Sequence, residues 1–354
     1  MRRAVAAVLL CTSTLLACSA ERAGTPLGPE AEPAGAPELA LYGIGDLHRA
    51  VPRACADPAY RQFDFWVGQW NIRNPAGAFN STSVVTSELD GCIVMEDFIN
   101  IGGFQGRSLS VYDARDRRWY QSFVDNVVGN YRISGSLEGE EMVMTGSQQV
   151  FSFATGTFRQ RDSRIVWTPN ADGTVRQVFV ESFDGAPAIT TFDGLYFAAA
   201  TLDRADPAVF NICRQQLPGA RHLDFWLGAW TVSAEPGPAA GRSTVAADLN
   251  DCLIEENFEG ANGFRSRSFL FYDFVVDRWF HTYADNAGEH FELSGGLEDG
   301  RMVLLGDETG PGGRSLKIRL TLAPADGGGV AQVIELSRDG GETWREALSL
   351  AYRR

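Results

Sequence analysis

The sequence reads RQFDFWVGQW at residues 61–70 and RHLDFWLGAW at residues 221–230, so an Asp-Phe-Trp-x-Gly-x-Trp motif occurs twice, 160 residues apart. Residues 61–147 align with residues 221–307 at this constant offset without a gap, and 30 of the 87 positions are identical. Similarity over this length indicates a tandem duplication of a whole domain rather than a thin solenoid repeat. Three aromatic residues within seven positions are typical of core packing, so we expect the motif to be structural.

Short strands dominate the pattern within each copy. Residues 108–126 contain two alternating runs around an Asp-Ala-Arg-Asp turn, and residues 268–286 repeat this arrangement. About ten such runs occur per copy, and no stretch of about 12 residues shows a clear helical stripe. Evenly spaced strands favour an antiparallel sheet closed into a barrel, because closure leaves no exposed edge. We therefore predict an all-β protein with two tandem antiparallel β-barrels, in domains at 53–198 and 210–354.

The Gly-x-Trp step that ends each motif resembles the start of the first strand in lipocalins and related calycin barrels. In those proteins a short helical turn precedes the strand, and the tryptophan closes one end of the barrel. The wider pattern FDFWVGQW…SLSVYD…RRWYQSFVDN…WTPNADGTVRQVFVESFDG…FDGLY resembles an uncharacterised bacterial family, the DUF1579-like or lipocalin-like proteins. The resemblance covers nearly all of residues 55–197 and, more loosely, residues 213–354. It implies a lipocalin-like, calycin-type barrel and an exported protein, and it implies no particular activity.

The N-terminal residues 1–20, MRRAVAAVLLCTSTLLACSA, carry two arginines followed by an apolar run, as in a secretory signal peptide. The segment ends in LLAC, which resembles a bacterial lipobox and implies cleavage before Cys18 and lipidation of its thiol. Ordinary cleavage after Ala20 is the alternative. Residues 21–52 are rich in Ala, Pro, Gly and Glu, which predicts a flexible linker. We expect the protein in the bacterial cell envelope, on the periplasmic side of the outer membrane or secreted.

The charge distribution limits the classes of partner. The net charge is −14, and no run of Lys or Arg stands out. Nucleic acid and anionic lipid surfaces are therefore not expected partners, and the N-terminal lipid anchor is the only membrane attachment that we predict. The sequence does not determine the oligomeric state.

Four cysteines follow the signal segment, namely Cys55, Cys92, Cys213 and Cys252. Four cysteines allow three pairings, and only Cys55–Cys92 with Cys213–Cys252 respects the duplication. Metal binding is the alternative, but no Cys-x-x-Cys spacing occurs. We therefore predict one disulfide in each copy.

Two equivalent segments, residues 118–126 and 278–286, are the best candidates for a ligand site. Alternate positions place polar and aromatic side chains on one strand face, which holds Trp119, Gln121, Phe123 and Asp125 in the first copy and Trp279, His281, Tyr283 and Asp285 in the second. Large retained aromatic residues face inward more often than outward, so we expect this face to line the barrel interior and contact a ligand. The two aspartates, each followed by Asn, also fit ordinary hairpin turns.

A retained glutamate gives a further candidate in each copy. Glu96 and Glu256 each lie four residues after a cysteine, on an otherwise apolar strand face. Such a carboxyl group is either a buried acid that contacts a ligand or the partner of a retained arginine, Arg107 or Arg267.

The remaining residues do not define a catalytic motif. No histidine is shared between the copies, so Ser108 and Ser268 have no common base to activate them. A metal site at His281, Asp285 and His290 has only weak support, because their spacing is irregular. We predict no cofactor, no metal and no catalytic residue.

Three classes of function fit these observations. The leading hypothesis is a binding protein for a small apolar or amphipathic molecule, held in one or both barrels. The second is an envelope enzyme that uses the retained carboxyl groups, Glu96 or Asp125, as general acid or base. The third is a structural or adaptor lipoprotein, which predicts filled barrels.

Overall fold

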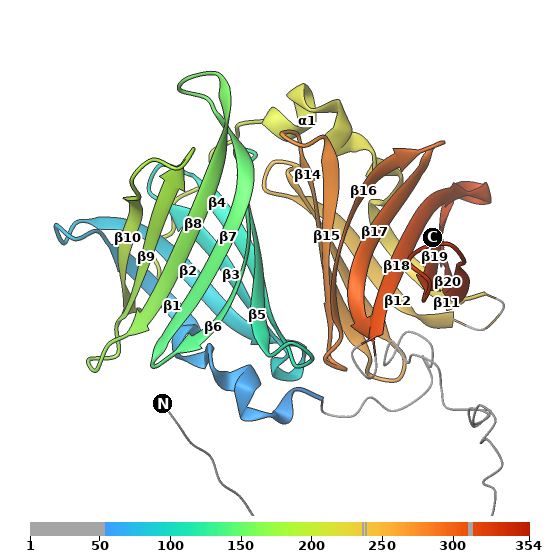
Figure 1. Ribbon diagram of the computed structural model, residues 1–354, viewed down its shortest axis with the longest axis horizontal. Coiled ribbons are helices and arrows are strands. Elements are labelled where there is room, and N and C mark those ends of the chain that lie inside the picture. Colours follow the sequence, from blue (N-terminus) through green and yellow to red (C-terminus); the bar gives the residue numbers. More distant parts are fainter. Residues whose placement is uncertain (1–53, 236, 238, 311–313) are drawn as a thin grey trace, which may run out of the picture. The chain divides into compact units, whose positions relative to one another are not determined.

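The computed structural model describes residues 54–235, 237, 239–310 and 314–354. The predicted signal peptide, the lipidation site at Cys18 and the linker at 21–52 lie outside these residues. The described chain forms two closed antiparallel barrels of ten strands each, which confirms the predicted fold class (Figure 1).

The first barrel is a simple meander in which each strand pairs with the next along the chain. Its strands are β1 (Gly68–Arg73), β2 (Phe79–Glu88), β3 (Ile93–Asn100), β4 (Gln105–Asp113), β5 (Arg118–Asp125), β6 (Asn130–Glu138), β7 (Glu141–Ser152), β8 (Thr157–Pro169), β9 (Val175–Phe183) and β10 (Ile189–Ala198). Pairing of β1 with β10, for example Ile72 with Tyr196, closes the sheet. Closure pairs the strands at both edges, so no edge is left open.

The second barrel repeats this topology. After the short helix α1 (Ile212–Gln216), its strands are β11 (Gly228–Ala234), β12 (Ala239–Asp248), β13 (Leu253–Gly260), β14 (Arg265–Asp273), β15 (Arg278–Asp285), β16 (His290–Glu298), β17 (Arg301–Gly310), β18 (Arg314–Ala325), β19 (Gly329–Ser337) and β20 (Arg345–Arg353). Val232 of β11 pairs with Tyr352 of β20 to close this barrel.

The repeated motif forms the start of β1 and the short 3-10 helix η3 (Asp64–Trp66) before it. The indole of Trp70 donates a hydrogen bond to the carbonyl oxygen of Trp66 at 2.8 Å, and Trp230 donates to Trp226 in the same way. A Cβ atom on Gly68 would lie only 3.2 Å from the Trp70 ring, which favours glycine there, whereas the matching distance at Gly228 is an ordinary 3.6 Å. The motif therefore fixes a tryptophan against the backbone at the start of each barrel.

Aromatic side chains close this end of the first barrel. The helical segments before β1 lie there (Figure 1). The buried Phe63 ring contacts Trp66 at 4.9 Å, Trp119 at 5.6 Å and Trp167 at 5.2 Å between centroids. Edge-to-face and stacked contacts of this kind stabilise a core beyond the area that they bury. This end of the barrel is therefore solidly packed.

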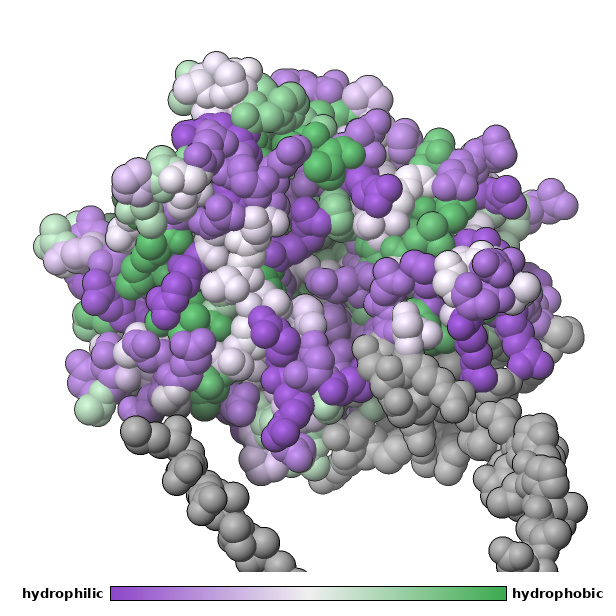
Figure 2. Space-filling view, in the orientation of Figure 1, coloured by the Kyte–Doolittle hydropathy of each residue, from purple (hydrophilic) through white to green (hydrophobic). Residues whose placement is uncertain are grey.

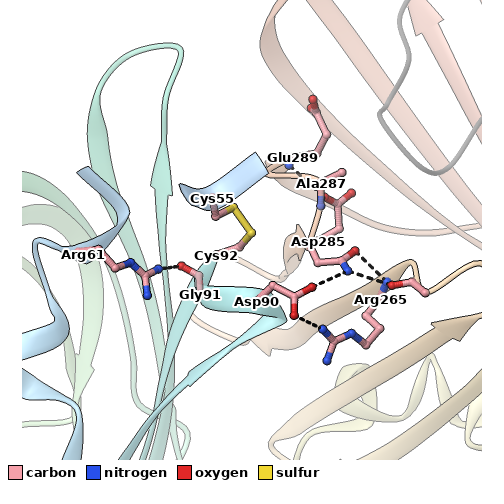
Figure 3. The surroundings of a disulfide bond; sticks show 11 residues. Cys55, Arg61, Asp90, Gly91, Cys92, Arg265, Asp285, Ala287 and Glu289 are labelled. Atoms are coloured by element: carbon pink, nitrogen blue, oxygen red, sulfur yellow. Dashed lines mark hydrogen bonds and ion pairs between the residues drawn. A yellow bond between two sulfur atoms is a disulfide. The ribbon is translucent and has the colours of Figure 1, made fainter. Parts of the chain in front are cut away.

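A disulfide is present in each barrel, Cys55–Cys92 and Cys213–Cys252, as predicted. Figure 3 shows the first, beside which Arg61 donates a hydrogen bond to the carbonyl oxygen of Gly91. Closing loops of 37 and 39 residues stabilises each barrel by about 4 kcal/mol on the chain-entropy account. Both bonds indicate an oxidising compartment outside the cytoplasm.

Hydrophilic residues cover most of the face shown in Figure 2, and hydrophobic residues form separate patches on it. No helix in the described part of the chain is long and apolar enough to cross a membrane.

Candidate functional site

The first barrel contains a cavity of about 200 Å³. Its apolar lining consists of Phe98, Phe104, Phe123, Ile165, Phe179 and Phe192, and its polar lining of Glu96, Gln121, Tyr131, Gln177, Thr191 and Tyr196. The lining thus contains one carboxyl group, two amides and no basic side chain. An apolar cavity with a few polar groups is the usual form of a small-molecule site.

Polar and apolar groups lie at different depths in this cavity. Tyr196 lies toward the closed end, where its ring is 6.4 Å from that of Trp66 and 6.2 Å from that of Trp70. Phe104 lies in the turn between β3 and β4, at the opposite end of the strands, with Phe98 beside it at 6.2 Å. The cavity therefore has polar groups at its floor, and phenylalanines together with Tyr131 and Thr191 toward the other end.

Two amides on the polar floor keep hydrogen-bonding capacity. Gln121 Nε2 donates to Ser110 Oγ at 2.8 Å, and Gln177 Oε1 accepts a hydrogen bond from the Tyr196 hydroxyl. Among the described residues, Gln121 Oε1 and Gln177 Nε2 have no further partner, so one acceptor and one donor remain for a ligand.

Glu96 supplies the only carboxyl group of the lining. Its side chain is buried, and its Oε1 accepts a hydrogen bond from Ser83 Oγ at 2.8 Å. Burial raises the pKa of Glu96 to about 8, although the Ser83 and Ser108 hydroxyl groups oppose this shift. The carboxyl group is therefore mainly protonated at neutral pH.

The alternative that Glu96 pairs with Arg107, and Glu256 with Arg267, is wrong. Glu96 lies opposite Ser108 in the register of β3 and β4, so Arg107, one residue away, projects from the other face of the sheet. The second barrel has the same register. The arginines form ion pairs elsewhere, Arg107 with Asp248 and Glu255, and Arg267 with Glu88.

A buried ion pair lies next to the cavity. The Arg161 guanidinium lies 3.7 Å from the centre of the Tyr131 ring, and its Nε is 3.5 Å from Glu181 Oε1. Glu181 also accepts hydrogen bonds from Tyr131 and Ser163, both at 3.0 Å. Arg161 also donates to the Asn130 carbonyl oxygen at 2.7 Å, although its Nε makes no hydrogen bond among the described residues, and the pair holds Tyr131 at the cavity wall.

The other two residues predicted for the first site lie outside the cavity lining. Trp119 packs at the closed end, and its indole donates to Gln62 Oε1 at 3.1 Å. Asp125 Oδ1 accepts hydrogen bonds from the backbone of Val127 at 2.8 Å and Gly129 at 2.7 Å, which holds the turn between β5 and β6. Burial raises the pKa of Asp125 to about 6. Glu96, Gln121 and Phe123 are the predicted residues that line the cavity.

The equivalent glutamate in the second barrel has more partners. Glu256 Oε1 accepts from Ser243 at 2.8 Å and from the Tyr352 hydroxyl at 2.9 Å, and its Oε2 accepts from Ser268 at 3.5 Å. Burial still raises the pKa of Glu256. Its carboxyl group is therefore satisfied within the protein.

The remaining predicted residues of the second barrel are internal packing and turn groups. Tyr283 stacks on Phe291 at 4.4 Å, and Trp279 donates to the Gly219 carbonyl oxygen at 3.0 Å. Asp285 accepts from the backbone of the following turn, as Asp125 does, and also from the Tyr283 hydroxyl. His281 is buried, its ring nitrogens make no hydrogen bond among the described residues, and burial lowers its pKa to about 3.

Histidines do not converge on a common centre. His290 lies on the outer face of β16, where its ring is 5.0 Å from that of Tyr120 and its Nδ1 is 3.6 Å from Asp113. The described residues contain no group of three or more side chains suited to hold a metal ion.

Aliphatic side chains occupy positions in the second barrel that are polar or small in the first. Strand register relates β8 to β18 through Met142 opposite Trp167 and Met302 opposite Leu322. On this basis Arg161, Ser163, Glu181 and Gly194 correspond to Leu316, Ile318, Leu336 and Leu350. Ile318 and Leu350 belong to the buried core, with Leu336 packed against it. At these positions the second barrel therefore packs aliphatic groups where the first has polar groups or glycine.

Comparison with known proteins does not assign a family. No family model matches this chain, and no curated protein matches it. The chain is similar to the crystal structure of a protein of unknown function from the DUF3598 family of Nostoc punctiforme PCC 73102, with 9% identity and a TM-score of 0.18, over 84% of this chain and 100% of that chain. This likeness is too slight to support an argument, and the DUF1579-like resemblance stays a prediction.

Proposed function

We propose that this protein binds one small amphipathic molecule inside its first barrel. The observation that carries the proposal is the cavity of about 200 Å³, with five phenylalanines and a polar floor. A cavity of roughly 150 Å³ is enough to hold benzene, so the ligand is about the size of a single-ring compound. The second barrel then has the same fold but no ligand site.

The titratable groups of the lining favour binding over catalysis. Burial raises the pKa of Glu96 to about 8 and raises those of Tyr131 and Tyr196 above the usual tyrosine range. All three groups therefore mainly hold their protons near neutral pH and can donate hydrogen bonds to a bound molecule.

We also propose that the protein is attached to the bacterial envelope through lipidated Cys18 and faces the periplasm. The signal-like segment and the LLAC sequence before it support this attachment. The two disulfides fit the same compartment, because such bonds persist where the environment is oxidising.

The test compares two variants at matched core positions, in the full mature chain. Ile165 lines the cavity, and its equivalent Leu320 lies in the filled core of the second barrel. With benzyl alcohol as probe in isothermal titration calorimetry, Ile165→Phe should abolish saturable binding, because the ring fills the cavity. Leu320→Phe should leave binding unchanged, although it overpacks the second core.

Circular dichroism should first show that both variants are folded. Unchanged binding by folded Ile165→Phe, or loss of binding only in Leu320→Phe, would place the site outside the first barrel.

A further inference from the structure

We infer that the ligand of the first barrel is an organic cation, a small amine whose ammonium group pairs with Glu96 and whose apolar body lies among the phenylalanine rings. This inference rests on the proposed ligand cavity and specifies the chemical class of its occupant.

The cavity lacks any group that would neutralise an anionic ligand. Glu96 is its only ionisable acid apart from two tyrosines, and no Lys, Arg or His side chain lines it. A buried carboxylate or phosphate on the ligand would face Glu96 without a counter-charge, which is costly. An ammonium group would instead supply the charge that the ionised Glu96 side chain lacks.

Comparison with Glu256 shows that Glu96 lacks one hydroxyl partner. In the second barrel the Tyr352 hydroxyl bonds Glu256, and Ser268 lies 3.5 Å from the other oxygen. The matching Tyr196 hydroxyl of the first barrel instead bonds Gln177, so Ser83 and Ser108 are the hydroxyl groups that act on Glu96. A buried carboxyl group that lines a cavity and has fewer partners than its counterpart points to a donor on the ligand.

The aromatic lining suits a cation. Phe123 and Tyr131 meet edge to face at 5.9 Å, and Phe179 and Phe192 lie at 5.3 Å. The negative faces of such rings attract ammonium groups, most strongly where water is excluded. The same rings also bury the apolar part of an amine.

The charge balance of the interior points the same way. Besides Glu96, the first barrel buries the carboxyl groups of Asp125 and Glu181, but Arg161 is the one cation described beside them. The whole chain has a net charge of −14, which attracts cations toward it.

Calorimetry with three single-ring probes of different charge tests this inference in the full mature chain. The probes are benzylamine as cation, benzyl alcohol as neutral control and benzoate as anion. We expect benzylamine to bind at least tenfold more tightly than the other two at pH 7.5. Its binding should release a proton as Glu96 ionises, seen as a dependence of the measured heat on the buffer.

Two matched variants assign the preference to one carboxyl group. Glu96→Gln should remove the tenfold preference for benzylamine over benzyl alcohol. Glu256→Gln should leave both affinities unchanged. Equal affinities for benzylamine and benzyl alcohol, or a preference that survives Glu96→Gln, would overturn the cation assignment and leave the cavity proposal standing. Absence of binding by all three probes would overturn both.

Discussion

Ser163 lies opposite Glu181 across β8 and β9 of the first barrel, and the matching positions in the second barrel hold Ile318 and Leu336. The two barrels otherwise share ten strands, a disulfide and a buried glutamate on the third strand. One barrel thus keeps a polar pair beside a cavity, while the other packs aliphatic groups. The difference shows that a ten-stranded sheet of this topology closes around a buried polar pair as well as around aliphatic side chains.

The two barrels share the aromatic packing of their closed end, where the first strand begins. The indoles of Trp70 and Trp230 make the same 2.8 Å hydrogen bond, and Trp66, Trp226, Trp119 and Trp279 are all buried. Dense aromatic packing and a disulfide there stabilise each barrel. The rest of the interior is then free to hold polar groups, or a cavity, without loss of the fold.

Truncation of matched interior positions should give the largest difference between the barrels. Ile318→Ala in the filled core should lower the stability of the second barrel by about 3 kcal/mol, because it removes packing and leaves a void. Ser163→Ala should cost the first barrel only about 1 kcal/mol, the net value of its hydrogen bond to Glu181. Hydrogen-exchange mass spectrometry reports each barrel separately. Equal losses would mean that the two interiors are filled alike.

The stability of the two barrels should also depend differently on pH. The folded pKa of Glu96 is about 8, above the unfolded value of 4.5, so stability is fully present below pH 4.5 and is lost as pH rises through 8. The slope approaches about 1.4 kcal/mol per pH unit. Glu96→Gln should flatten this loss in hydrogen exchange of the first barrel. An unchanged slope would contradict a neutral, buried Glu96.

His281 gives the second barrel the opposite dependence. Its folded pKa of about 3 is below the unfolded 6.5, so this stability is present above pH 6.5 and is lost as pH falls toward 3. The first barrel has Gln121 at this position, which does not titrate. His281→Gln should therefore remove part of the acid sensitivity of the second barrel and leave that of the first unchanged.

Replacement of the turn aspartates should give the smallest difference between the two barrels. Asp125→Ala and Asp285→Ala each remove two hydrogen bonds to the backbone of a turn, at a cost of about 2 kcal/mol. Denaturant unfolding together with benzyl alcohol titration distinguishes this role from ligand contact. Weaker binding by folded Asp125→Ala would instead support the ligand role predicted from the sequence.

The structural features that occur in both barrels could be predicted from the sequence. The duplicated motif, the alternation of residues 118–126 and the paired cysteines were enough for the barrels, the disulfides and the inward position of Gln121 and Phe123. These features depend on local spacing and on the constant offset between the two copies.

Half of the cavity could not be found in this way. Six lining residues lie on β8, β9 and β10, where the two copies no longer align at a constant offset: Ile165, Gln177, Phe179, Thr191, Phe192 and Tyr196. Whether they enclose a space depends on side-chain volumes brought together from distant strands. The alternation in VRQVFVESF, residues 175–183, is the signal that places Gln177 and Phe179 on one face.

Xenon binding in crystals of the mature protein tests the central claim most directly, because xenon enters empty apolar cavities. We predict a xenon peak in the first barrel, among Phe98, Phe123 and Phe179, and no peak inside the second barrel beside Ile318 and Leu350. A peak inside the second barrel, or none in the first, would contradict the division between a hollow barrel and a filled one.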